Sequence, residues 1–80
     1  MAVKLYDRIA LKIAVPGQDV RPGDVATVVD FVEHPAHGPR GCVLEFFNAL
    51  GESIRVITVP ENGIEPLRSD EVLSVRPLAM

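Results

Sequence analysis

The first part of the chain alternates apolar and polar residues. Between Asp7 and Ile13, isoleucine and leucine side chains occupy every second position from Ile9, and the charged side chains of Arg8 and Lys12 lie on the other face. This period of two predicts a strand that is buried on one face. The run stops at a Pro-Gly pair, residues 16–17. The next such pair, Pro22-Gly23, predicts a tight turn, because proline presets φ and glycine accepts a positive φ.

Three apolar runs follow, the first and the third rich in β-branched residues, and each is bounded by glycine, proline or asparagine. Such residues suit a pleated sheet, so we expect strands over residues 25–33, 41–47 and 53–59. The connection His34–Arg40 holds two prolines and a glycine and is expected to be irregular. After a break at residues 60–63, we predict one helical turn over residues 67–72 and a short last strand over residues 73–76.

Five short strands joined by turns, without a long amphipathic helix, predict an all-β fold. A sheet of this size buries one face most simply by curling on itself. We therefore expect a small, partly open SH3-like barrel of about five strands, with one short 3-10 turn near the C-terminus. Eighty residues support one hydrophobic core, so residues 1–80 are expected to form a single domain.

The middle strands carry apolar residues on both faces. In the run 41–47, every second residue from Cys42 faces one side, and Val43 and Phe47 face the other. No predicted helix is long enough to cover a second face. Either loops and the tail, residues 78–80, fold over part of it, or it forms an exposed apolar patch that binds protein. For the second case the candidate interface residues are Val43, Phe47, Ile57 and Val59, or their opposite-face neighbours.

The charge distribution bears on the class of partner. The chain has a net charge of −3, and its eight lysines and arginines are spread along the whole length. An acidic chain repels phosphate unless its basic residues gather in one place, so nucleic acid is an unlikely partner. A nucleic-acid-binding barrel related to the KOW modules is the alternative function. A groove for proline motifs is disfavoured because the chain has one tyrosine and no tryptophan.

The side chains that perform chemistry are scattered. Cys42 has no second cysteine to pair with and lies in an apolar run, which predicts a small buried side chain. His34 and His37 have the spacing of a metal-ligand pair, but a zinc site needs further ligands, so we interpret them as exposed loop residues. We assign no catalytic, cofactor-binding or metal-ligating residue and no small-molecule substrate. The expected function is a non-enzymatic protein-interaction module, either a homo-oligomer or the small subunit of a pair.

The location of the protein is predicted from its apolar runs. Charged residues are mixed into the first eight positions, and no apolar run approaches the length of a membrane span. We expect a cytoplasmic protein without membrane contact.

Four stretches, taken in order, resemble a family of short bacterial proteins, the domain of unknown function DUF4926. They are Leu5–Leu11, Arg21–Val29, Leu44–Phe47 with Gly51-Glu52, and Val56–Val59. The resemblance implies a fold and not an activity. Members of such families often accompany a toxin-like or other two-gene partner, which is an analogy. The segment His34–Arg40 is an addition to the family pattern and inherits no role from it.

Overall fold

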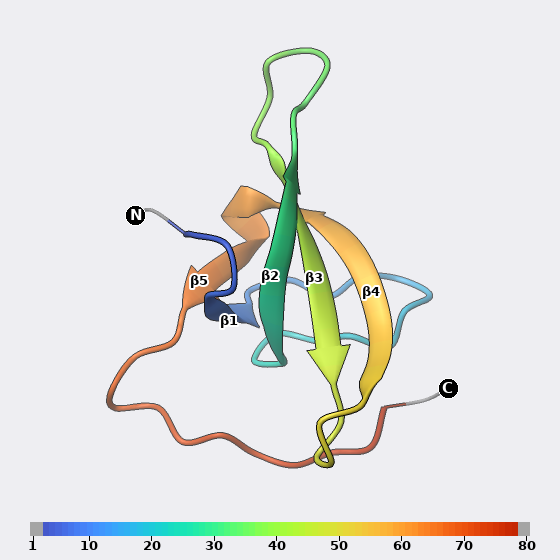
Figure 1. The fold of residues 1–80 in the computed structure, drawn as a ribbon, viewed down its shortest axis with the longest axis vertical. Coiled ribbons are helices and arrows are strands. Elements are labelled where there is room, and N and C mark those ends of the chain that lie inside the picture. Colours follow the sequence, from blue (N-terminus) through green and yellow to red (C-terminus); the bar gives the residue numbers. More distant parts are fainter. Residues whose placement is uncertain (1–2, 79–80) are drawn as a thin grey trace.

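A computed structural model describes residues 3–78 and contains five antiparallel strands in one sheet (Figure 1). The strands are β1 (Arg8–Leu11), β2 (Val25–Val32), β3 (Gly41–Phe47), β4 (Ser53–Pro60) and β5 (Ile64–Pro66), and a 3-10 turn, η1 (Glu61–Gly63), precedes β5. Their order across the sheet is β4-β3-β2-β1-β5. The predicted all-β class, with five strands, one short 3-10 turn and a partly open sheet, is confirmed.

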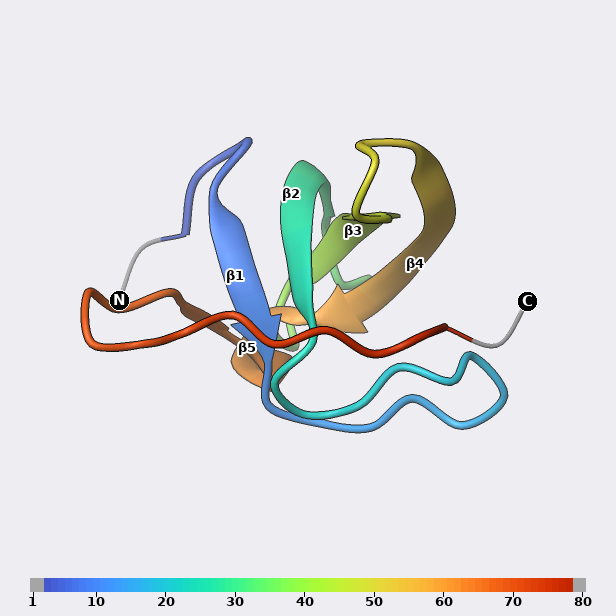
Figure 2. The ribbon, with the colours of Figure 1, turned by 90° about the horizontal axis from the view of Figure 1, so that it is seen from below.

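The sheet curves strongly around a core (Figure 2). Its inner face buries Ile9, Leu11, Val28, Leu44 and Val59, which are almost fully excluded from solvent. Val20 joins them from the long segment between β1 and β2, which folds back on itself through a bridge between Val15 and Val20. Burial of this apolar surface is the main favourable term for a domain of this size.

The last strand lies earlier in the chain than the sequence pattern indicates. Ile64 is buried and pairs with Leu11, which makes β5 the neighbour of β1. Gly63 approaches Ile13 so closely that a Cβ atom would lie 2.8 Å from its Cδ1. The predicted helical turn over residues 67–72 and strand over residues 73–76 are wrong. In this segment Val72 and Val75 face water, so no buried apolar face stabilises a regular element.

Two β-bulges explain much of the two-sided apolar pattern. The register between β2 and β3 shifts between Val28 and Asp30, so that Val28 and Phe31 both lie on the core side. A second shift, next to Phe47, lets Ile54 of β4 pack against the core as well. A bulge inserts one residue and so reverses the phase of alternation. The expectation that the middle strands carry apolar residues on two opposite faces is therefore wrong in part, because in β2 and β4 residues that simple alternation places on opposite faces share the core.

Candidate functional site

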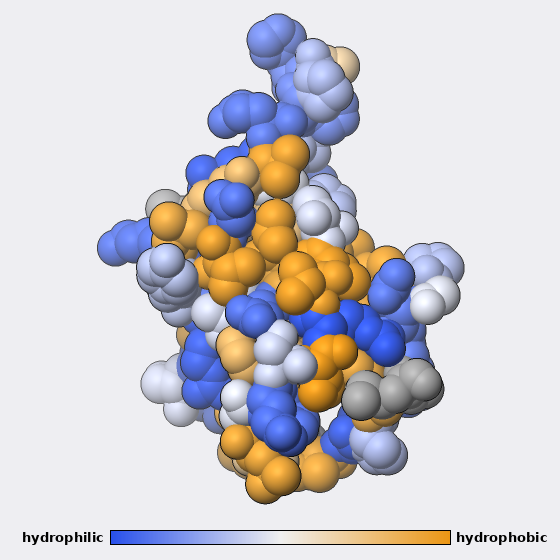
Figure 3. Space-filling model, turned by 45° about the vertical axis from the view of Figure 1, so that its right-hand side comes forward, coloured by the Kyte–Doolittle hydropathy of each residue, from blue (hydrophilic) through white to orange (hydrophobic). Residues whose placement is uncertain are grey.

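The outer face of the sheet holds two of the four residues predicted as an interface. Val43 is half-buried and Phe47 is 46% exposed, both on the side of β3 away from the core. Val56, their neighbour on β4, is 56% exposed and pairs with Glu45. We call Val43, Phe47 and Val56 the outer patch. Figure 3, which brings the β4 side of the molecule forward, shows hydrophobic residues gathered there and interrupted by hydrophilic ones.

The other two predicted interface residues lie in the core. Val59 is 2% exposed and pairs with Cys42, and Ile57 is buried opposite Leu44. Cross-strand partners share a face, so both side chains point inward. Placing them at an exposed interface is wrong. Their neighbour Val56 lies on the opposite face of β4 and is exposed. The strand register, which the sequence does not define, decides which face each side chain takes.

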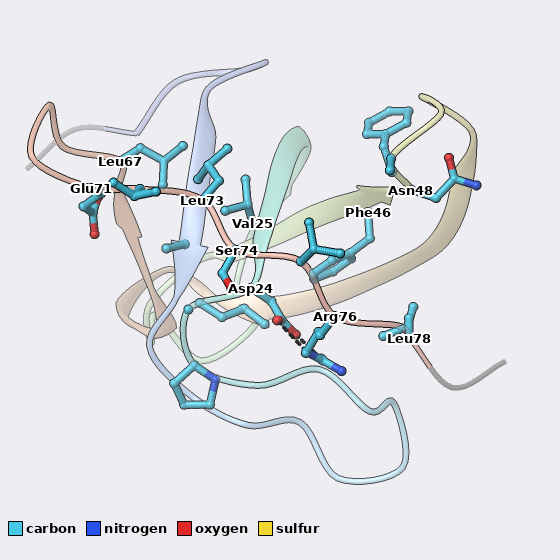
Figure 4. Close-up of a pocket in the computed structure, with 18 of the residues that line it drawn as sticks. Asp24, Val25, Phe46, Asn48, Leu67, Glu71, Leu73, Ser74, Arg76 and Leu78 are labelled. Carbon is cyan, nitrogen blue, oxygen red and sulfur yellow. Dashed lines mark hydrogen bonds and ion pairs between the residues drawn. The ribbon is translucent and has the colours of Figure 1, made fainter.

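A groove lies at the open end of the curved sheet. With the C-terminal segment in place as one wall, contributed by Leu67 and residues 71–78, it has a volume of about 1110 Å³. Its other walls come from β1, the turn before β2, the end of β3, the start of β4 and Glu65 of β5. Its apolar residues include Leu11, Val25, Phe46 and Ile54. Residues 67–78, which we call the tail, cross this groove as an irregular strap (Figures 2 and 4).

One arginine ties the tail to the sheet. The Nε of Arg76 donates to Oδ1 of Asp24 at 3.0 Å, and its Nη2 donates to the other oxygen of the same carboxylate (Figure 4). Nη2 also donates to the carbonyl oxygen of Asp19 at 2.7 Å. The hydrogen bond to Asp24 raises the pKa of Arg76 above its ordinary value, against an opposing effect of desolvation. Two parallel bonds from one guanidinium to one carboxylate give geometric specificity as well as attraction.

The Pro22-Gly23 turn places Asp24 at the rim of the groove. Gly23 has a φ of 93°, as the sequence indicated, and its amide donates to the carbonyl of Leu11 at 2.8 Å. The Asp24 carboxylate also accepts the backbone N–H of Arg21 at 2.8 Å. The carboxylate is thus held in position by its own turn. The sequence revealed the turn but not its ion pair, because no local spacing connects Asp24 with an arginine so far along the chain.

The rest of the tail has few attachments. Leu78 packs against the core cluster, whereas Val72 and Val75 are more than 90% exposed. Within residues 3–78, no backbone hydrogen bond joins residues 72–78 to a strand. The tail therefore covers the open end of the core and leaves most of the outer patch bare, although Phe47 borders both surfaces. Ala79 and Met80, which belong to the expected covering segment, lie outside the described residues.

A second arginine anchors the long loop between β2 and β3. Arg40 bonds to Glu61 through Nε at 2.8 Å, and its guanidinium lies 3.8 Å from the ring centre of Phe31. The hydrogen bond to Glu61 raises the pKa of Arg40. This arrangement joins the base of the loop to η1.

Cys42 and the two histidines match their predicted environments. Cys42 is fully buried, and desolvation raises the pKa of its thiol, with a smaller contribution from Glu61. His34 and His37 are exposed, and Nδ1 of His34 accepts the amide of Ala36 at 3.0 Å. Across the part of the chain that the structure describes, no three histidine, cysteine, aspartate or glutamate side chains group closely enough to hold a metal ion.

Comparisons with known proteins give a family and no relative of known activity. No curated protein and no solved structure matches the chain. Among residues 3–78 there is no helix with the length and apolar character needed to cross a membrane. The family model described as "Domain of unknown function (DUF4926)" matches residues 5–66, from the segment before β1 to the end of β5 and without the tail. The chain belongs to this family of unknown function.

Proposed function

We propose that the domain is a non-enzymatic protein-interaction module that binds another protein chain through the outer patch and the free edge of β4. The observation that carries the proposal is the position of β4. It is an eight-residue strand at the end of the sheet, and within residues 3–78 it pairs with β3 alone. A long edge strand has unpaired N–H and C=O groups and is a template for a strand from another chain.

The side chains beside this edge favour a protein partner. Val43, Phe47 and Val56 bring apolar surface next to it, and the outer face of their strands carries few charges apart from Glu45. Main-chain pairing supplies attraction along the edge, and the apolar side chains supply selectivity. A second copy of this chain satisfies both requirements, because β4 of one copy can pair with β4 of another around a two-fold axis.

The nucleic-acid alternative draws less support. Arg21, Arg40, Arg68 and Arg76 each pair with a carboxylate, so half of the basic residues are already partly neutralised. Binding to phosphate would require them to exchange these partners. The proposal includes a cytoplasmic location.

Light scattering of the pure protein over a range of concentrations tests the second-copy partner. The proposal predicts a concentration-dependent dimer that Val56→Lys weakens. Lysine suits this position because it faces Glu45 across the strands and opposite charges stabilise such a pair. The matched control is Leu50→Lys, on the exposed loop between β3 and β4, which should leave the dimer unchanged.

If the protein stays monomeric in light scattering, the same variants are tested for binding to a different partner protein. A partner co-purified by the wild-type chain should be lost with Val56→Lys and Phe47→Glu and retained with Leu50→Lys. The folded state of each variant is checked by circular dichroism. Retention of the partner by folded variants at both positions would contradict the proposal.

A further inference from the structure

The groove and the tail support an inference that is independent of the outer patch. We infer that the groove is a binding site for an extended peptide segment bearing an arginine, and that the tail is its resident ligand. The recognised element is Arg76-Pro77-Leu78, with the guanidinium at the rim and the leucine in the apolar part. The same site accepts a segment of this chemistry from another chain when the tail leaves it.

The rim of the groove is a preformed arginine site. The turn holds Asp24 through the amide of Arg21, and Asp19 adds a carbonyl oxygen 2.7 Å from the guanidinium and a carboxylate oxygen 3.6 Å from it. With Arg76 in place, the side chain of Asp24 is 19% exposed. A planar guanidinium matches this set of acceptors better than the point charge of a lysine does.

The apolar part of the groove receives the leucine that follows. Leu78 packs against the core cluster, and the lining next to the tail includes Phe46 and Ile54. Figure 4 shows Leu78 and Arg76 on neighbouring stretches of the tail, with Asp24 facing Arg76. Pro77 between them restricts the backbone to an extended form, which lowers the entropy lost on binding. One charged contact and one apolar contact, separated by a stiff residue, form a compact recognition element.

Side-chain contacts attach the tail to the domain, in the same way that they attach a bound peptide. Residues 72–78 make no backbone hydrogen bond to any strand in the described part of the chain. The family match ends at Pro66, the last residue of β5, so the tail lies beyond the matched residues. Its removal from the groove breaks no strand ladder, which makes exchange with another segment feasible.

Tethering sets how strongly the tail competes. A short flexible connection gives a bound segment an effective concentration on the order of millimolar. An external peptide must displace this competitor, so its apparent affinity for the wild-type chain is its intrinsic affinity multiplied by the fraction of molecules in which the tail is released. Weakening the tail while leaving the rim intact should therefore increase the affinity for an added peptide.

The test uses the full chain and a fluorescent peptide with the sequence of residues 71–80. Arg76→Ala releases the tail without changing Asp24, and we expect it to bind the peptide about tenfold more tightly than the wild type does. The matched control is Arg68→Ala, which removes a tail arginine that pairs with Asp70 outside the groove, and should behave as the wild type. Fluorescence anisotropy gives the dissociation constants.

Two changes locate the interaction at the rim. A peptide with alanine in place of its arginine should bind Arg76→Ala at least tenfold more weakly. Adding Asp24→Asn to Arg76→Ala should have a similar effect, and asparagine retains an acceptor for the amide of Arg21. A thermal melt confirms that the double variant is folded.

Three results would overturn the inference. The first is the absence of saturable peptide binding to Arg76→Ala at millimolar peptide. The second is equal affinity for the peptide with and without arginine. The third is a wild-type dimer that Arg76→Ala abolishes, which would mean that the tail occupies the groove of a second copy and is not a ligand of its own domain. Loss of the outer-patch dimer with Val56→Lys bears on none of these.

Discussion

Strand β3 and the tail are both extended, but β3 is held by backbone pairing and the tail by side-chain contacts. β3 pairs along both edges, with β2 and with β4, and buries Cys42, Leu44 and Phe46. The tail has no strand partner in the described part of the chain and leaves Val72 and Val75 in water. Backbone ladders and core packing make β3 part of one cooperative unit. The tail depends on Arg76 and Leu78, so it should open separately from the sheet.

This difference shows how a small domain can combine a fixed scaffold with an exchangeable part. The match to the family ends with β5, where the last strand pairing ends. The tail, residues 67–78, lies on a surface that the scaffold has already formed. Opening of the tail then changes access to the groove without loss of the fold.

The largest expected difference between the two regions is in thiol reactivity. Cys42 on β3 reacts only when the sheet opens, whereas a thiol introduced by Val75→Cys is exposed at all times. Since global opening costs roughly 5 kcal/mol or more, we expect Cys42 to be alkylated at least about a thousandfold more slowly. The two rates are measured with iodoacetamide by mass spectrometry. Similar rates would show that β3 opens as readily as the tail.

The same thiol predicts a loss of stability in alkali. Burial raises the pKa of Cys42 in the folded state. Folding therefore favours the protonated thiol. This stabilisation is complete below the unfolded pKa of about 8.5 and is lost as the pH rises through the higher folded pKa. Cys42→Ala should remove this part of the alkaline loss, as measured by denaturation between pH 8 and 11.

The next largest effect is on the free energy of unfolding. Leu44→Ala leaves a cavity at the centre of the core and should lower it by about 2–5 kcal/mol. Val75→Ala, at 91% exposure, is the control in the tail and should change it by less than about 0.5 kcal/mol. Both values come from urea denaturation. Comparable losses for the two variants would mean that the tail belongs to the cooperative unit.

A smaller loss is expected at the turn that connects the two regions. Gly23 has a positive φ with open space around it, so Gly23→Ala introduces backbone strain without a collision. We expect a loss of about 1–2 kcal/mol in the free energy of unfolding. The displaced Asp24 should also hold Arg76 less well, which limited proteolysis of the tail reports. Wild-type stability would show that the turn adjusts without strain.

The smallest effect on stability is expected from Arg76→Ala. The substitution removes the ion pair with Asp24 that holds the tail, and it leaves every strand pairing intact. The midpoint of urea denaturation should stay close to that of the wild type, whereas proteolytic cleavage within the tail should become several times faster. Resistance of the tail to cleavage in this variant would show that other contacts hold it.

Local patterns were sufficient to predict much of the sheet. The apolar runs between turn residues predicted β3 with its observed bounds and placed the ends of β2 and β4 within one residue. The two-residue β-turn signal at Pro22-Gly23 and the buried Cys42 were also visible in the sequence. These features depend on residues that are neighbours in the chain, where propensity and alternation are informative.

The features that the sequence did not reveal depend on contacts between distant residues. β5 is a three-residue strand, too short for a periodic pattern, and is defined by its pairing with β1. The bulge next to Asp30 changes which side chains face inward, and no residue type marks it uniquely. The Arg76–Asp24 pair joins positions that only the folded chain brings together. Val59 was misplaced for the same reason, because register decides its face.

Nuclear magnetic resonance gives the sharpest test of the division between scaffold and tail. In this division, residues 3–66 form the scaffold and the tail is held in the groove through side-chain contacts. Amide spectra and hydrogen exchange are compared between the wild type and Arg76→Ala. We expect changes in amide chemical shift in the tail and along the groove, at residues such as Asp24 and Val25. The protection of the Val28 and Leu44 amides from hydrogen exchange should be unchanged. Loss of protection at Val28 and Leu44 would contradict this division.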